Sequence, residues 1–515
     1  MSKTAYVTTP IYYPSGHPHL GHAYTTVAAD VYARFMRLDG YDTKFLTGTD
    51  EHGLKLQQAA AKAGKDTQEF IDELSAKFRE VTHFMNASND DFIRTTEARH
   101  KKSAVAMWKR LEENGFIYKG SYSGWYCVSD EAYYTEDELE DKDGEKIAPS
   151  GHPVEWMEEE SYFLKLSAFE KQLTDLYEKT RPDMIRPVSR RNEVLSFIKG
   201  GLEDISISRT TFDWGIKVPG DDKHVMYVWI DALTNYLSAL DWPNGEDMRY
   251  WPALHLVGKD ILRFHAVYWP AMLLGAGFKE DELPRIFAHG WWTSGGKKMS
   301  KSFGNVIDPQ EVTEIYGVDQ IRYFMMREIS FGSDGDFSED RLVERINSDL
   351  ANSLGNLFQR VLSMVQKNCD GKMPSTPENL TDEDSAYILA CTEVTGKARK
   401  FIQDVKYHDA LQVIWDLIYE ANRYMDAQQP WILRKEDPKR MEDVLRVLVE
   451  SFKYISLLTE PFMPESARLM QRQIAWEDKT FADLGGSAST FFGFEEGEEL
   501  PKPSGIFMRI EKEAA

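Results

Sequence analysis

The run AYVTTPIYY at residues 5–13 is rich in valine, threonine, isoleucine and tyrosine, as buried parallel strands are. A Pro-Ser-Gly turn and the stretch HLGH at residues 19–22 follow it. Apolar residues then recur at helical spacing, at Val27, Val31, Phe35 and Leu38. A second strand-like run starts at Thr43 and ends at Asp50. A strand, a helix and a strand in this order predict a right-handed parallel unit.

Candidate ligand-binding residues fall at the carboxyl ends of these two strands, where parallel sheets bind their ligands. Gly21 lets the backbone come close to a phosphate at the amino end of the helix, where the helix dipole also favours an anion. His19 and His22 are three residues apart and share one face of that helix. Asp50 ends the second strand. The pattern predicts a phosphate site, although a histidine pair by itself is usually a satisfied helix start.

A second motif, KMSKS at residues 298–302, follows the pair Gly295-Gly296. It packs two ammonium groups and two hydroxyls into five residues, which suits a loop that closes on a polyphosphate. By itself, a short basic run is usually a solvated surface loop. Both motifs in one chain, in this order, predict that the protein activates a nucleotide.

Length and composition exclude several classes of protein. The 515 residues suffice for about three domains, each with its own core. No apolar stretch approaches the roughly 20 residues that a membrane span needs, and the first residues do not resemble a secretory signal. The cysteines Cys127, Cys369 and Cys391 form no CxxC pair, which argues against a disulfide framework or a cysteine-rich zinc site. We therefore expect a cytoplasmic protein without membrane association.

The net charge is −23, from 61 lysines and arginines against 84 acidic residues. This balance argues against indiscriminate binding of nucleic acid. It still allows a structured RNA partner, provided that basic residues gather on one face and that phosphate contacts are few.

The pattern changes along the chain. Residues 116–215 hold tyrosine- and tryptophan-rich pieces and acidic turns, as an insertion into the sheet would. Strand-like runs at 225–230 and 254–257 resume the sheet, and long amphipathic patterns beyond residue 345 predict a helical bundle. We expect an α/β Rossmann-like parallel-sheet domain at 1–115 and 216–275, an α+β insertion at 116–215, a region around the second motif at 276–345, and an all-α bundle with an irregular tail at 346–515.

HLGH and KMSKS resemble the HIGH and KMSKS elements of class I aminoacyl-tRNA synthetases. Four further segments resemble one family of that class, the methionyl-tRNA synthetases: FLTGTDEHG at 45–53, FDWGI at 212–216, YVWIDA at 227–232 and GKDILRFH at 258–265. The resemblance covers essentially the whole chain. It implies a catalytic Rossmann-like domain with a connective insertion, followed by a helical anticodon-binding domain.

The resemblance implies ATP-dependent activation of L-methionine to methionyl-adenylate and transfer to the terminal adenosine of tRNA(Met), initiator tRNA included. A carboxylate attacks the α-phosphorus of ATP, so the protein mainly positions the reactants and stabilises negative charge. No protein base is needed, because the substrate carboxylate is already ionised. The implied catalytic residues are His19, His22, Lys298 and Lys301. The implied ATP site, with Mg²⁺, comprises Tyr12, Gly21, His22, Asp260, Lys298, Ser300 and Lys301.

Methionine needs a carboxylate for its ammonium group and an aromatic pocket for its thioether. Asp50 fits the first role. The resemblance implies that the pocket is lined by Ile11, Tyr13, Trp229, Ala232, Leu233, Tyr236, Phe264, His265 and Trp269. The residues themselves show only that aromatic side chains gather near strand ends, and ordinary core residues remain the alternative.

The helical part should read the anticodon, because single-stranded bases are recognised by stacking and by hydrogen bonds to their edges. Trp431 offers a stacking face, while Asn356 and Arg360, four apart on one helix, can donate to base edges. These three match the family's anticodon-reading positions. Without the resemblance, a tryptophan after a proline is as often a packed helix end. The chain ends near residue 515, without the dimerisation domain of some relatives, so we expect a monomer.

The chain departs from the family in its insertion, where many relatives carry zinc knuckles of CxxC type. Asp130 stands where the partner of Cys127 is expected, and Ile147 and Ser150 replace the second pair of thiolates. One thiolate cannot build a tetrahedral zinc site without ligands from elsewhere. We expect a knuckle with no bound metal, held by the packing of residues such as Trp125, Tyr126 and Trp156.

Four other families or functions fit the sequence less well. The enzymes for valine, isoleucine and leucine carry a larger editing insertion, because one methyl group is worth only about 1–3 kcal/mol of discrimination. The cysteine enzyme selects its substrate with a cysteine-bound zinc. A silent RNA-binding paralogue should have lost its ATP residues, and a free nucleotidyltransferase would have no use for the helical part.

Overall fold

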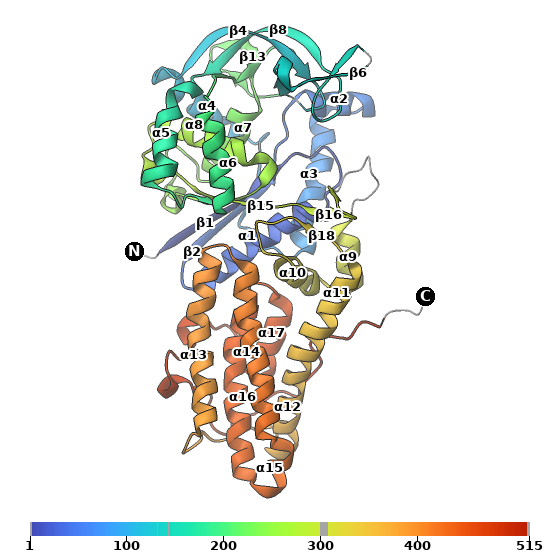
Figure 1. Ribbon diagram of the computed structural model, residues 1–515, viewed down its shortest axis with the longest axis vertical. Coiled ribbons are helices and arrows are strands. Elements are labelled where there is room, and N and C mark those ends of the chain that lie inside the picture. The colour runs from blue at the N-terminus through green and yellow to red at the C-terminus, as the bar shows by residue number, and fades with distance from the viewer. Residues whose placement is uncertain (1–2, 131, 143, 299–306, 512–515) are drawn as a thin grey trace.

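A computed structural model describes residues 3–130, 132–142, 144–298 and 307–511. Figure 1 shows an elongated molecule with a parallel sheet near its middle. The antiparallel strands β4 (Ile117–Cys127) and β8 (Glu155–Leu164) lie at one end, and a bundle of long helices forms the other.

Among the described residues, the central sheet is parallel throughout and has the strand order β3-β2-β1-β14-β15-β9. Its strands in chain order are β1 (Thr4–Tyr12), β2 (Asp42–Thr49), β3 (Asp91–Arg94), β9 (Ile185–Arg186), β14 (Leu254–Gly258) and β15 (Arg285–His289). Helix α1 (Leu20–Leu38) connects β1 to β2. The predicted strand-helix-strand unit is therefore confirmed.

Both faces of the central sheet are covered, and successive residues of a strand point to opposite faces. Val7 and Leu256 pack in one core with α1 and the helical bundle. Their neighbours Tyr6 and Val257 pack in a second core with α4 (Ala98–Glu113), α7 (Val228–Ser238) and α8 (Trp269–Gly275). Burial on both faces explains why the run at 5–13 shows no clean alternation of apolar and polar residues.

Helix α1 lies between the sheet and the bundle, and every residue from Ala23 to Met36 is buried. This burial includes a charge, because the Asp30 side chain is fully enclosed. The carboxylate pairs with Arg34 at 2.7 Å and with Arg322 at 2.6 Å. Paired partners and hydrogen bonds make such a buried charge tolerable.

Arg322, on α10 (Val318–Arg327), joins three parts of the chain. Besides Asp30, its guanidinium donates to the backbone oxygens of Met85 at 2.9 Å and of Pro461 at 2.8 Å. Pro461 lies between two helices of the bundle. The arginine therefore fixes the bundle to α1 through polar contacts as well as through the shared apolar core.

The insertion is built on the antiparallel pair β4 and β8, with β5 (Ala132–Tyr134) and β10 (Ile205–Ser206) at its edges. Within the expected range 116–215, however, β9 pairs with β15 and forms an edge of the central sheet. The chain therefore returns to the sheet once before the insertion ends.

The strand predicted for the central sheet at 225–230 is wrong. β13 (Asp221–Met226) ends inside this run and pairs antiparallel with β11 (Ser208–Arg209) and β12 (Lys217–Val218) in a separate small sheet. Helix α7 then begins at Val228 and is buried at every position from Ile230 to Ser238. A helix buried on all sides starts with the same β-branched and aromatic residues as a buried strand, so periodicity cannot separate the two.

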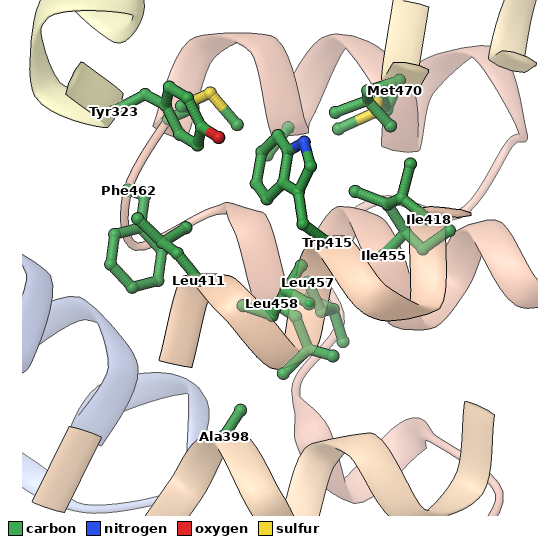
Figure 2. Packing of buried hydrophobic residues seen from close by; sticks show 14 of the residues in the cluster. Tyr323, Ala398, Leu411, Trp415, Ile418, Ile455, Leu457, Leu458, Phe462 and Met470 are labelled. Atoms are coloured by element: carbon green, nitrogen blue, oxygen red, sulfur yellow. The ribbon is translucent and has the colours of Figure 1, made fainter. Parts of the chain in front are cut away.

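The predicted helical bundle is confirmed. Its helices are α12 (Asn356–Asn368), α13 (Asp382–Gln403), α14 (Tyr407–Gln428), α15 (Pro430–Glu436), α16 (Pro438–Thr459) and α17 (Pro464–Gln473). Figure 2 shows Trp415 of α14 in the middle of the core between these helices. Tyr323 of α10 packs against its ring with centroids 4.5 Å apart, so the core continues out of the bundle.

The remaining helices are α2 (Leu54–Ala63), α3 (Thr67–Phe84), α5 (Glu170–Asp175), α6 (Val188–Lys199), α9 (Pro309–Tyr316) and α11 (Glu339–Arg345). The remaining strands are β6 (Glu140–Lys142), β7 (Glu145–Ile147), β16 (Trp292–Ser294), β17 (Lys297–Lys298) and β18 (Gly335–Asp336). Within the described ranges, none of the helices combines the length and the apolar character that a membrane crossing requires.

Replacing Arg322 by methionine should lower the free energy of unfolding by about 3–5 kcal/mol, because it leaves buried Asp30 without its main partner. Urea unfolding measures the effect. Arg249→Met is the matched control, because its pair with Asp42 lies at the surface and should leave the unfolding midpoint unchanged. Equal midpoints for both variants would show that the buried pair does not stabilise the fold.

Candidate active site

A cavity of about 330 Å³ opens at the carboxyl ends of the central strands. Of the residues predicted for ATP and catalysis, those that line it are Tyr12, His19, Gly21, His22 and Asp260. Of those predicted for methionine, the lining residues are Ile11, Tyr13, Asp50, Trp229, Ala232, Leu233, Tyr236 and His265. Residues far apart in the sequence therefore meet at one edge of the sheet.

The first turn of α1 fixes how its two histidines carry their protons. Nδ1 of His19 accepts from the backbone N–H of Gly21, and Nδ1 of His22 accepts from the backbone N–H of His19, both at 3.1 Å. Because each Nδ1 accepts, each ring carries its hydrogen on Nε2. Burial, and to a smaller extent the neighbouring His19, lower the pKa of His22 well below its ordinary value, so this ring is neutral at pH 7. The cavity wall thus contains two N–H donors, on rings whose centroids are 3.9 Å apart.

Gly21 is needed for this arrangement. A Cβ at this position would come within 2.9 Å of Cε1 of His19, so any side chain would displace the imidazole. The sequence predicted a glycine here for the approach of a phosphate, whereas the atoms nearest to Gly21 in the structure are those of the His19 ring.

The other end of the cavity is apolar and contains a further neutral histidine. Nδ1 of His265 lies 3.0 Å from the backbone oxygen of Ile261 and must donate to it, so Nε2 accepts from the Tyr236 hydroxyl at 2.6 Å. Burial lowers the pKa of His265 to about 4. Behind Tyr236, His255 accepts from the indole of Trp269 at 3.2 Å, and burial also lowers its pKa well below the ordinary value.

Two of the predicted methionine residues do not line the cavity. Phe264 stacks on Trp229 with ring centroids 3.4 Å apart. Trp269 is fully buried behind His255. Phe264 therefore supports a side chain that lines the cavity, and Trp269 lies one layer further back. A motif cannot make this distinction.

Four residues at the end of β15 and directly after it were not predicted from the sequence. His289, Gly290, Trp291 and Trp292 all line the cavity. The indole N–H of Trp291 donates to Asp260 Oδ1 at 3.0 Å, so this tryptophan directly contacts the carboxylate predicted for the ATP ribose. The signal was present, because the run Ile286-Phe287-Ala288 marks a strand and strand ends gather at the same edge.

Of the KMSKS motif, only Lys298 lies within the described residues. The backbone of Lys298 pairs with Thr293 in the hairpin of β16 and β17, whereas Ser300 and Lys301 lie outside the described residues. On the far side of the motif, the backbone oxygen of Ile307 accepts from the N–H of Leu20 at 3.2 Å. The described chain before the motif therefore ends next to Trp292, which lines the cavity. The described chain after the motif begins beside the first turn of α1.

The predicted anticodon residues lie at the far end of the bundle, where α15 is labelled in Figure 1. Trp431 is 37% exposed. The guanidinium of Arg360 lies 5.3 Å from the centroid of its ring, and Asn356 is exposed one turn earlier on α12. The three residues thus come from two helices, and an exposed tryptophan with an adjacent cation suits base stacking.

In the knuckle, a hydrogen-bond network surrounds Asp130. Its carboxylate accepts from the hydroxyls of Tyr134, at 2.8 Å, and of Ser150. Burial raises the pKa of Asp130, but these bonds and Cys127 outweigh burial and lower it. Within the described ranges, the three side chains that lie close enough together to hold a metal ion are Glu160, Asp221 and His224, which are outside the knuckle. Both carboxylates of this group are ion-paired with Lys119. The residues at the knuckle do not fit a tetrahedral zinc ion.

Comparison with known proteins identifies the family. A family model described as tRNA synthetases class I (M) matches residues 5–362, and one described as the anticodon binding domain of methionyl tRNA ligase matches residues 374–515. The chain belongs to the class I methionyl-tRNA synthetases. The predicted family and fold class are therefore confirmed.

Individual methionyl-tRNA synthetases match over nearly their full length. The methionine–tRNA ligase of Brucella suis biovar 1 is 52% identical over 98% of this chain and 97% of its own. That of Rickettsia bellii is 50% identical over 99% of this chain and 100% of its own. The structure of Mycobacterium tuberculosis methionyl-tRNA synthetase in complex with methionyl-adenylate has a TM-score of 0.93 and 47% identity, covering 98% of this chain and 100% of that one. The predicted activity, ligation of methionine to tRNA, is confirmed, and the alternative families are not supported.

The depressed pKa of His265 predicts a pH dependence of stability. Between pH 6.5 and about 4, the unfolded state binds a proton on this ring and the folded state does not. The free energy of unfolding should therefore fall as the pH is lowered through this window, by roughly 3 kcal/mol for this group. Urea unfolding at several pH values should show a shallower slope for His265→Gln than for wild type. His17→Gln, at an exposed position, is the control; the same slope for all three proteins would contradict the assignment.

Proposed function

We propose that this chain activates L-methionine with ATP in the cavity at the strand ends and then transfers the methionyl group to the terminal adenosine of tRNA(Met), initiator tRNA included. One observation carries the proposal: the two Nε2–H donors of His19 and His22, the carboxylate of Asp50 and the apolar wall around Tyr236 line one cavity. ATP enters as its Mg²⁺ complex, whose phosphate oxygens bind the ion. No structural zinc is proposed.

In the activation step, a carboxylate oxygen of methionine forms a bond to the α-phosphorus, and the bond from that phosphorus to pyrophosphate breaks. Negative charge grows on the phosphate oxygens, where N–H donors of neutral rings stabilise it. Asp50 binds the methionine ammonium, and Asp260 binds the ribose hydroxyls. The reacting carboxylate is ionised at pH 7, so no protein base takes part.

We assign the ammonium groups of Lys298 and Lys301 and the hydroxyl of Ser300 to the β- and γ-phosphates. The backbone on both sides of the motif supports this assignment, because one side lies next to the cavity and the other bonds to Leu20. At the opposite end of the molecule, we assign Asn356, Arg360 and Trp431 to the anticodon. As a translation enzyme, the protein is proposed to work in the cytoplasm as a monomer.

Asp50→Ala should raise the methionine KM in pyrophosphate exchange by about 10- to 100-fold, because the substrate ammonium loses a charged hydrogen-bond partner. The ATP KM should stay within about twofold of wild type. Asp260→Ala is the reciprocal control and should raise the ATP KM instead.

The exchange assay also tests the proposed function itself. Wild-type protein assayed with each amino acid in turn should exchange pyrophosphate only with methionine. Intact protein without methionine-dependent exchange would refute the activity, whereas equal effects of Asp50→Ala on both substrates would refute only the role of Asp50.

Trp431→Ala should leave pyrophosphate exchange unchanged and lower kcat/KM for tRNA charging by about 10- to 100-fold, the effect of losing one stacked base. Leu389→Ala, an exposed apolar side chain elsewhere on the bundle, should change neither reaction. A loss of exchange in Trp431→Ala would mean that the tryptophan supports the fold.

A further inference from the structure

Asp231 is a buried carboxylate that lies beside the cavity without lining it. Its side chain is 1% exposed and contacts two histidines from different parts of the chain. Oδ2 lies 2.6 Å from Nδ1 of His52, and Oδ1 lies 2.7 Å from Nε2 of His100. Burial would raise the pKa of this carboxyl, but the two histidines lower it below its ordinary value, so Asp231 is charged at pH 7.

His52 belongs to the loop that carries Asp50, and this loop is held from several directions. The backbone N–H of Asp50 donates to Tyr12 at 2.9 Å, and that of Glu51 donates to Thr95 at 2.9 Å. The His52 ring bonds to Asp231. Trp214 of the FDWGI segment donates its indole N–H to the backbone oxygen of Glu51 at 2.7 Å.

Asp231 itself sits in the first turns of α7, which forms the other wall of the cavity. Trp229, Ala232, Leu233 and Tyr236 project from this helix into the cavity. The His52–Asp231 bond therefore joins the loop that holds the ammonium partner to the helix that holds the side-chain pocket.

His100, on α4, holds the other oxygen of Asp231. Its Nε2 donates to Oδ1 of the carboxylate, and its Nδ1 lies 3.0 Å from the hydroxyl oxygen of Ser238. Asp231 and Ser238 are two turns apart on α7, so this ring joins α7 to α4 at two points. Hydrogen bonds from two histidines allow the carboxylate charge to remain buried.

We propose that Asp231 is a positioning residue for methionine: through His52 and His100 it sets the spacing between the carboxylate of Asp50 and the apolar pocket on α7. This inference rests on the proposed role of Asp50. If the distance between the carboxylate that binds the ammonium group and the apolar pocket is fixed, an amino acid can occupy both only when its side chain has the matching length. Asp231 thereby contributes to the selection of methionine over longer analogues without touching the substrate.

Asp231→Asn tests this role, because the amide keeps the shape of the side chain but accepts with only one oxygen. The methionine KM in pyrophosphate exchange should rise by roughly 10- to 100-fold, the cost of a misplaced binding group. The ATP KM should stay within about twofold of wild type. The ratio of kcat/KM for methionine over ethionine, which is one methylene longer, should fall.

A double variant separates positioning from general stability. If Asp231 acts through Asp50, then adding Asp231→Asn to Asp50→Ala should raise the methionine KM no further. Asp384→Asn is the matched control: this buried carboxylate accepts two bonds from Arg440 in the helical bundle, far from the cavity. It should lower thermal stability and leave both KM values unchanged.

The outcomes are distinct. A wild-type methionine KM in Asp231→Asn, an equal rise of both KM values, or a full additive effect in the double variant would overturn the proposal. If Asp231→Asn does not fold, His52→Gln and His100→Gln replace it and carry the same expectation. Wild-type protein without methionine-dependent exchange would instead refute the proposed function and would be seen before any variant is made.

Discussion

The common direction of the central strands is the constraint on which the site depends. Because β1, β2, β14 and β15 run in parallel, the residues that follow each of them meet at one edge of the sheet. Asp50, Asp260 and Trp291 lie near one another for this reason, although long stretches of chain separate them. The side chains differ in chemistry, but the parallel direction of the strands brings all of them to the same edge of the sheet.

The sequence predicted best where local pattern and tertiary environment agree. The first parallel unit and the bundle carry clear periodicity, and the lining of the cavity by Asp50 and His22 follows from strand ends and the helix start. The run at 225–230 failed because a helix buried on every side shows no polar face. Phe264 and Trp269 were expected in the pocket but lie behind it, and Trp291 was missed, since side-chain direction depends on packing that no motif encodes.

Burial keeps imidazoles in the cavity wall and behind it neutral at pH 7. His22, His255 and His265 all have pKa values lowered mainly by burial. A neutral ring still donates one hydrogen bond, but it does not repel the ammonium group of an amino acid held nearby. The neutral rings therefore add no positive charge to this part of the cavity wall.

The burial of α1 on every side has a consequence for the modularity of this enzyme. One face of the central sheet, this helix and the bundle share a single continuous core. Arg322 joins the helix to the bundle through hydrogen bonds to Asp30 and Pro461. Neither half could be moved to another protein without exposing a broad apolar surface and leaving a charged side chain without its partner. New specificity for tRNA would therefore have to arise by substitution within the bundle, which matches an anticodon binding domain, and not by exchange of whole domains.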